Sequence, residues 1–291
     1  MPTPFAAVTR ATPAPGAPGR YTGEIDASWG LQPLPQGGVV TALAARAMAT
    51  EVADPDHRLR TLHTTFVAPV ATGPVGIDVE VLRAGRSMSH LRAEVRSVGA
   101  RHGHLTTAVF GGPRRGFAFC DLEPPTGFVP LGEARSFREG PPPGVEPFPP
   151  RPFWDTRLEG RAALGHAPWD EYTPDRAEHG TWYRMDDPPV DGRGVLDPLA
   201  LVVFADTMPG AVAEKLDPGD RRGWFGPSVD LTVHLLDDCH SDWVFAHNRA
   251  RFAGDGYASV DMALWDFGPD GTGSGRLVAY ATQLCFFTFD D

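Results

Sequence analysis

Residues 36–51 read QGGVVTALAARAMATE, and the fold prediction begins from this stretch. Two glycines, Gly37 and Gly38, precede a run rich in Ala that also contains Leu and Met. Ala, Leu and Met favour helix more than most residues do, and the glycines mark the entry of the chain into it. We therefore predict a helix over Val39–Glu51.

Segments of alternating polarity follow this helix. A period of two places successive side chains on opposite faces of a strand. The predicted strands are Arg58–Val67, Val75–Leu82, Ser87–Val98 and His104–Phe110. Short turn sequences such as Ala84-Gly85 separate them, which favours antiparallel hairpins.

The second half of the chain has the same order of elements. Asp197 can cap a helix with Pro198 at its first position, and we predict that this helix runs to about Leu216. The predicted strands that follow are Ser228–Leu235, Trp243–Phe252, Tyr257–Trp265 and Arg276–Phe289. One helix followed by four antiparallel strands, repeated twice, predicts an α+β fold in which a sheet wraps a helix in each repeat.

Proline is concentrated between the two halves. The segment 113–152 holds 11 of the 30 prolines, and proline interrupts both helices and strand ladders. We predict an extended connection there. It divides the chain into an N-terminal unit at 1–112, the connection at 113–152 and a C-terminal unit at 153–291.

Composition excludes several classes of protein. The 37 acidic and 26 basic residues give a net charge of −11, whereas a nucleic-acid binder needs a basic surface. Three cysteines are too few for a disulfide framework, which favours reduced thiols and a cytoplasmic protein. The sequence contains neither a signal-peptide core in its first twenty residues nor the run of about 18 apolar residues that a membrane span needs.

Asp206 is the most unusual residue of the second predicted helix. Helical spacing places it on one apolar face with Leu199, Val202, Val203 and Gly210. A carboxylate on such a face needs hydrogen-bond partners, and perturbed acids often mark functional sites. A structural role, with local backbone satisfying the carboxylate, stays as open as a functional one.

Two polar residues on the predicted strands are further candidates. Ser228 shares one face of a predicted strand with Asp230, Thr232 and His234, because they stand two residues apart and apolar residues lie between them. This pattern is typical of the solvated face of a sheet. Gln283 lies in a strand that is apolar on both faces, so its amide needs partners inside the protein.

Other catalytic motifs are missing from the sequence. There is no G-x-S-x-G, so a hydrolase with a nucleophile elbow is not expected. His102 and His104 have no third ligand at metal spacing, and surface or turn positions are expected for both. We predict neither a metal nor a cofactor.

Short motifs occur in a fixed order over residues 20–111 and 180–289. They are Trp29, Gln36-Gly37-Gly38, LHTTFVAP at 62–69, VEVLRAGRS at 79–87, Phe204-Ala205-Asp206, Ser228-Val229-Asp230 and Ala281-Thr282-Gln283. Their order and spacing resemble the type II acyl-CoA thioesterases and their thioesterase-like relatives. That family folds as a double hotdog, two repeats of a helix wrapped by an antiparallel sheet.

The resemblance implies a catalytic set of Asp206, Ser228 and Gln283. In the family these positions orient the water that hydrolyses an acyl-CoA to free acid and CoA. The resemblance also implies an acyl-CoA or acyl-carrier thioester substrate, no cofactor and a homo-oligomer. The first predicted helix has no carboxylate between Gly38 and Thr50, so we expect one site per chain.

Four further residues are expected to contact substrate. Gly37 and Gly38, whose N–H groups could bind an oxyanion, and His63 lie in the matched motifs. Arg249 is a candidate by charge, together with Arg251 and Arg221-Arg222, because CoA carries phosphates and the chain is acidic overall.

Two other functions fit the same sequence features. A non-hydrolytic acyl-thioester-binding or tailoring protein of polyketide or fatty-acid metabolism would keep the fold but tolerate loss of any of the three catalytic residues. A hydratase of the same fold would need an Asp/His pair, and Asp230 and His234 stand four residues apart on one predicted strand.

Overall fold

The computed structural model describes residues 3–31, 33–145, 150–167, 169–217 and 224–289. The N-terminal half contains α1 (Pro4–Val8), β1 (Thr12–Pro13), β2 (Arg20–Ile25), the 3₁₀ turn η1 (Ala27–Trp29), α2 (Gly37–Val52), β3 (Arg58–Phe66), β4 (Gly73–Ala84), β5 (Met88–Ser97) and β6 (His104–Gly111). The C-terminal half contains η2 (Phe137–Glu139), α3 (Pro152–Thr156), β7 (Leu158–Leu164), β8 (Glu178–Met185), α4 (Pro198–Ala205), α5 (Gly210–Ala213), β9 (Trp224–Phe225), β10 (Asp230–Leu235), β11 (Val244–Gly254), β12 (Tyr257–Asp266), β13 (Arg276–Phe286) and β14 (Thr288–Phe289).

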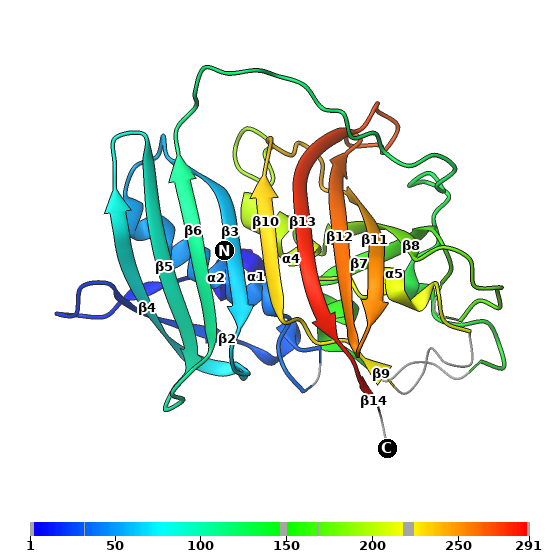
Figure 1. Ribbon diagram of the computed structural model, residues 1–291, viewed down its shortest axis with the longest axis horizontal. Coiled ribbons are helices and arrows are strands. Elements are labelled where there is room, and N and C mark those ends of the chain that lie inside the picture. The colour runs from blue at the N-terminus through cyan, green and yellow to red at the C-terminus, as the bar shows by residue number, and fades with distance from the viewer. Residues whose placement is uncertain (1–2, 32, 146–149, 168, 218–223, 290–291) are drawn as a thin grey trace.

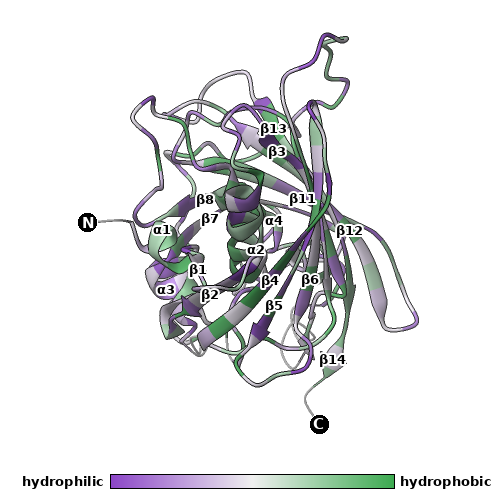
Figure 2. Ribbon diagram, turned by 90° about the vertical axis from the view of Figure 1, so that its left-hand side faces the viewer, coloured by the Kyte–Doolittle hydropathy of each residue, from purple (hydrophilic) through white to green (hydrophobic). Residues whose placement is uncertain are grey.

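Twelve antiparallel strands form one sheet in the order β1-β2-β4-β5-β6-β3-β10-β13-β12-β11-β8-β7. Strand β3 pairs with β10, so the sheet is continuous across the two halves. Helices α2 and α4 contact each other and lie on one face of the sheet, which curves around them (Figures 1 and 2). The predicted α+β fold of two wrapped helices is confirmed, although β1, β2, β7, β8 and β9 were not predicted and the last predicted strand is divided into β13 and β14.

Both central helices are buried on nearly every side. Residues Leu199–Ala205 of α4 are all buried, and so are Gly38–Ala45 of α2. A helix that is apolar all round belongs in a core, where the sheet removes it from water. The two helices contact each other, and Gly38 at the start of α2 lies against Val202 near the end of α4.

The predicted helix Asp197–Leu216 is wrong in its length. Helix α4 ends at Ala205, Asp206 is its C-cap, and a separate short helix begins at Gly210. Pro209 explains the break, because proline donates no backbone hydrogen bond and disfavours helical geometry in the residue before it. Asp206 therefore lies at the end of a helix and not on a continuous face that includes Gly210.

The connection between the halves is partly packed against the sheet. Residues 112–135 form no helix or strand and arch over the end of the sheet beyond β6 (Figure 1). Within them Phe128 and Leu131 pack against Trp182 and Phe245, on the sheet face away from the helices. The division at 1–112, 113–152 and 153–291 stays a prediction.

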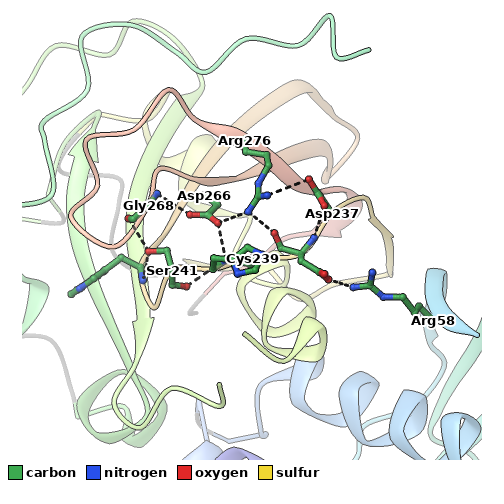
Figure 3. Close-up of polar contacts among 10 residues, drawn as sticks. Arg58, Asp237, Cys239, Ser241, Asp266, Gly268 and Arg276 are labelled. Atoms are coloured by element: carbon green, nitrogen blue, oxygen red, sulfur yellow. Dashed lines mark hydrogen bonds and ion pairs between the residues drawn. The ribbon is translucent and has the colours of Figure 1, made fainter. Parts of the chain in front are cut away.

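Polar contacts brace the loop between β10 and β11. The Asp266 carboxylate accepts hydrogen bonds from the backbone N–H groups of His240 and Gly268, both at 2.8 Å, and from Arg276 at 2.9 Å. Arg276 also pairs with Asp237 (Figure 3). One residue further, Asp238 forms an ion pair with Arg58 of β3, which links the loop to the other half.

Asp266→Ala is expected to lower the free energy of unfolding by about 2–4 kcal/mol. The variant leaves two N–H groups and a guanidinium without their acceptor at a site where the Asp266 side chain is only 4% exposed. Arg58→Ala is the control, since a half-exposed ion pair contributes about 0–1 kcal/mol. If urea unfolding showed that both variants lose the same free energy of unfolding, the result would contradict this account.

Candidate active site

Asp206 lies where the two central helices meet. Its Oδ2 accepts a hydrogen bond of 2.8 Å from the backbone N–H of Gly38, in the first turn of α2. Its Oδ1 accepts from the Ser228 hydroxyl at 3.1 Å and from the Gln283 amide at 2.6 Å. The Gln283 amide also donates to Ser228 Oγ at 2.7 Å, so the three predicted catalytic residues form one closed cluster.

A register shift brings Ser228 to this cluster. Thr232 pairs with Thr282, whereas Ser228 pairs with Cys285, so four residues of one strand (232 − 228) oppose three of the other (285 − 282). The extra residue is a β-bulge, and it moves Ser228 to the face that Gln283 and Cys285 share. Asp230 stabilises the bulge by accepting the backbone N–H of Leu284 at 2.8 Å.

The predicted common face of Ser228, Asp230, Thr232 and His234 is therefore wrong for Ser228. Strand β10 begins only at Asp230, and its core face carries Leu231 and Val233. Perfect alternation in the sequence hides the bulge, because a single extra residue reverses the face of everything before it.

Burial sets the protonation of Asp206. Removal from water raises the pKa of this carboxyl to about 6, and the hydrogen bonds from Gly38, Gln283 and Ser228 act in the opposite direction. The N-terminus of the 16-residue helix α2 also points its partial positive charge at the carboxylate. The result is a carboxylate that is ionised at neutral pH and basic enough to take a proton.

Gly37 and Gly38 allow the backbone of α2 to approach this carboxylate. A Cβ on Gly38 would lie 2.8 Å from the Val202 carbonyl oxygen and 3.0 Å from Cβ of Asp206. A Cβ on Gly37 would lie 2.7 Å from the ring of Phe66 and 2.9 Å from Asp206 Oδ2. No side chain fits at either position, which gives a physical reason for the Gly-Gly pair.

Two of the predicted substrate contacts lie away from the cluster. His63 alternates with the buried Leu62 and Thr64, and its ring bonds Thr232 at 2.9 Å on the sheet face away from the helices. Arg249 lies on the same outer face and pairs with Asp261 at 3.4 Å. The structure brings Gly37 and Gly38 to Asp206 but not His63 or Arg249.

The remaining candidates are Arg251, Arg221-Arg222, His102 and His104, and the side chain of His102 is half-exposed beside Glu94, as expected. Arg251 pairs with Asp261, and Arg221 and Arg222 lie outside the described residues. His104 is buried against the ring of Phe66, with the ring centroids 4.8 Å apart, so the expected surface or turn position is wrong for it.

Sequence reasoning missed one residue of this site. The sequence marks Gln36 only as part of a motif, yet its amide joins the start of α2 to the end of α4. The available signal was an uncharged polar residue directly before a Gly-Gly helix entry, which predicts a cap but not a contact 170 residues away.

Two family models match the chain, one for each half. Residues 25–111 match the family model "Acyl-CoA thioesterase N-terminal domain", and residues 134–287 match "Acyl-CoA thioesterase C-terminal domain". Together the two matches cover most of the chain. A search of curated protein sequences finds no significant match.

Solved structures share the fold over the whole chain. A conserved protein of unknown function with a hot dog fold from Alicyclobacillus acidocaldarius is 23% identical, with a TM-score of 0.77 and coverage of 99% of this chain and 98% of that one. The acyl-CoA thioesterase II TesB2 from Mycobacterium marinum is 20% identical, with a TM-score of 0.72 and 99% of each chain covered. The dehydratase domain of RzxB from Pseudomonas fluorescens is 14% identical, with a TM-score of 0.53 and coverage of 92% and 94%.

In the ranges that the structure describes, no helix has the length and apolarity to cross a membrane. A cytoplasmic location stays a prediction. The sheet order, the two wrapped helices and the paired domain matches agree with the predicted double hotdog. The chain belongs to the acyl-CoA thioesterase family.

Proposed function

We propose that the protein hydrolyses acyl-CoA thioesters to a free acid and CoA, with Asp206 as general base. The observation that carries the proposal is the closed cluster of Asp206, Ser228 and Gln283 at the N-terminus of α2. Fold alone does not choose the reaction, since a dehydratase domain has a similar fold. The choice depends on the chemistry of the cluster.

The hydrogen bonds indicate which atom receives the proton. Asp206 Oδ1 accepts two bonds, from Ser228 and Gln283, whereas Oδ2 accepts one, from Gly38, and the N–H of Gly37 also favours the ionised carboxylate. In the proposed step Oδ2 takes a proton from water as the water oxygen bonds to the thioester carbonyl carbon. The C–S bond then breaks, and the thiolate leaves with little help because a thiol has a pKa near about 8.5.

Ser228 and Gln283 hold the base in place in this proposal. Both N–H groups of the Gln283 amide are used, one on Asp206 and one on Ser228. Its carbonyl oxygen lies 3.3 Å from the Cys285 thiol. A flip of the amide group would therefore break its contacts with Asp206, Ser228 and Cys285. The CoA or carrier-protein donor and a homo-oligomeric state stay predictions.

A hydratase has less support from the structure. Asp230 is occupied with the Leu284 N–H, and His234 is exposed on the outer face of β10. None of the histidines among the described residues makes a hydrogen bond to Asp206, so the acid/base pair that a hydratase needs is not formed there.

The function is tested by incubating the purified protein with acyl-CoAs of short, medium, long and aromatic acyl groups and following free thiol. Hydrolysis predicts thiol release with at least one of these groups. Tight binding of an acyl-CoA without thiol release would favour the non-hydrolytic binding or tailoring function. Thiol release together with transfer of the acyl group to another acceptor would likewise overturn hydrolysis.

The pH dependence of hydrolysis is expected to follow Asp206. The base acts only when ionised, so kcat/KM is expected to rise with pH to a plateau above a pKa of about 6. Below that value kcat/KM is expected to fall about tenfold for each pH unit. A profile that stays flat down to pH 5 would exclude Asp206 as the base.

A further inference from the structure

The buried side-chain amide of Gln36 makes three hydrogen bonds. The side chain is 0% exposed, and its Oε1 accepts the N–H of Val39 at 2.8 Å, which caps α2. Its Nε2 donates to the carbonyl oxygens of Val203 at 3.0 Å and Asp206 at 3.1 Å, which are among the last carbonyls of α4. One amide thus satisfies groups at the ends of both helices.

These bonds fix the distance across which Gly38 reaches Asp206. Gln36 and Gly38 are two residues apart at the start of α2, while Val203 and Asp206 span the last turn of α4. The amide therefore holds the Asp206 backbone, and the Gly38 N–H holds its carboxylate. If Gln36 lost its two donors, the two helix ends could separate, and the Gly38 contact would lengthen.

We propose that Gln36 is a positioning residue for the reaction, which sets the basicity of Asp206 by locking the start of α2 to the end of α4. This inference rests on the proposed function. Gln36 does not touch the carboxylate itself, so it acts through Asp206 and Gly38. Its loss weakens a hydrogen bond that favours the ionised carboxylate, and the pKa of Asp206 is then expected to rise.

Among the residues that the structure describes, few other groups near Asp206 titrate. From β13, Cys285 faces it, and burial together with the charges of Asp206 and Asp230 raises the pKa of that thiol to about 12. Asp230, the first residue of β10, is a charged neighbour bound to Leu284 N–H. From β6, His104 lies behind the Phe66 ring, and burial lowers its pKa to about 4. In the range pH 5–8 the thiol therefore stays protonated and His104 stays largely neutral.

The chain offers a matched control at a second polar contact between the same helices. Arg46 of α2 forms an ion pair with Asp197, the N-cap of α4. Arg46→Met removes this other polar link between α2 and α4 without touching the site. Any effect that comes only from weaker helix packing should therefore appear in Arg46→Met as well.

The test uses Gln36→Met, which removes the cap and both donors, and Gln36→Asn, which keeps an uncharged amide that can cap α2 but is one methylene shorter. The acid limb of kcat/KM is expected to move up by about 0.5–1 pH unit in Gln36→Met, less in Gln36→Asn and not in Arg46→Met. At pH 6 this corresponds to a loss of about two- to fivefold beyond any loss at pH 8.

A direct titration of Asp206 separates the two proposals. The protein is labelled with ¹³C-carboxyl aspartate, and the Asp206 signal is assigned by its absence from Asp206→Asn. A raised Asp206 pKa in the Gln36 variants, with wild-type behaviour in Arg46→Met, supports the inference even if no acyl-CoA is hydrolysed. An unchanged Asp206 pKa in folded Gln36→Met overturns it, whether or not the enzyme hydrolyses thioesters.

Discussion

Asp206→Asn is expected to lower kcat for acyl-CoA hydrolysis by at least about 100-fold, while the protein stays folded. A positioned general base contributes about 10²–10⁴-fold, and the Asn side chain cannot take the proton from water. The shape of the side chain is kept, so Ser228 and Gln283 lose little of their packing. The measurement is kcat from thiol release at pH 8, where the wild-type carboxylate is ionised.

Stability is expected to change with pH in the direction opposite to activity. Burial raises the folded-state pKa of Asp206 to about 6, above its value of 3.8 outside the fold. Ionisation therefore costs folding free energy as pH rises from about 4 to 6, and the loss persists above that. The melting temperature of wild type relative to Asp206→Asn should fall over this range.

Asp197→Asn is the matched control for this variant. It makes the same chemical change at the other end of α4, where Asn can still cap the helix. Its kcat is expected to stay within about twofold of wild type, because Asp197 touches none of the reacting groups. Full activity of Asp206→Asn, or an equal loss in both variants, would overturn the role given to Asp206.

Gly38→Ala is expected to lower kcat/KM by about 10- to 100-fold and to destabilise the protein by about 1–3 kcal/mol. The added Cβ would lie 2.8 Å from the Val202 carbonyl oxygen, which is backbone and cannot rotate away. The start of α2 must then shift from the end of α4. That shift removes the Gly38 N–H from Asp206 Oδ2 and misplaces the base.

Gly76→Ala controls for the general effect of adding a methyl group. Gly76 lies in β4, and a Cβ added there would have no atom within 4 Å, so the replacement should leave activity and stability nearly unchanged. Gly38→Ala with wild-type kcat/KM would show that the close approach of α2 is not needed for the reaction.

Regular elements were predicted from sequence because their patterns are local. Alanine content predicted α2 to within two residues at its start, and alternation predicted β3, β5 and β12 nearly to their ends. The strands β7 and β8 were missed. Their burial does not alternate regularly, since the outer face of β8 at Trp182 is covered by the connection between the halves.

The geometry of the site could be predicted only in part. Asp206 was identified by its unusual polarity and by resemblance, but its position at a helix end depends on Pro209. Ser228 reaches the site through a bulge that the alternating sequence conceals. The Gln36 bonds join residues about 170 positions apart, and no local pattern predicts such a contact.

The most direct test of the central claim is a single turnover in ¹⁸O-labelled water with enzyme in excess over acyl-CoA. If a water activated by Asp206 attacks the thioester, the released acid carries one ¹⁸O in its carboxyl group, and Asp206→Asn produces no acid on the same timescale. Released acid without ¹⁸O, with the label recovered in Asp206, would show that the carboxylate attacks as a nucleophile and would contradict the account.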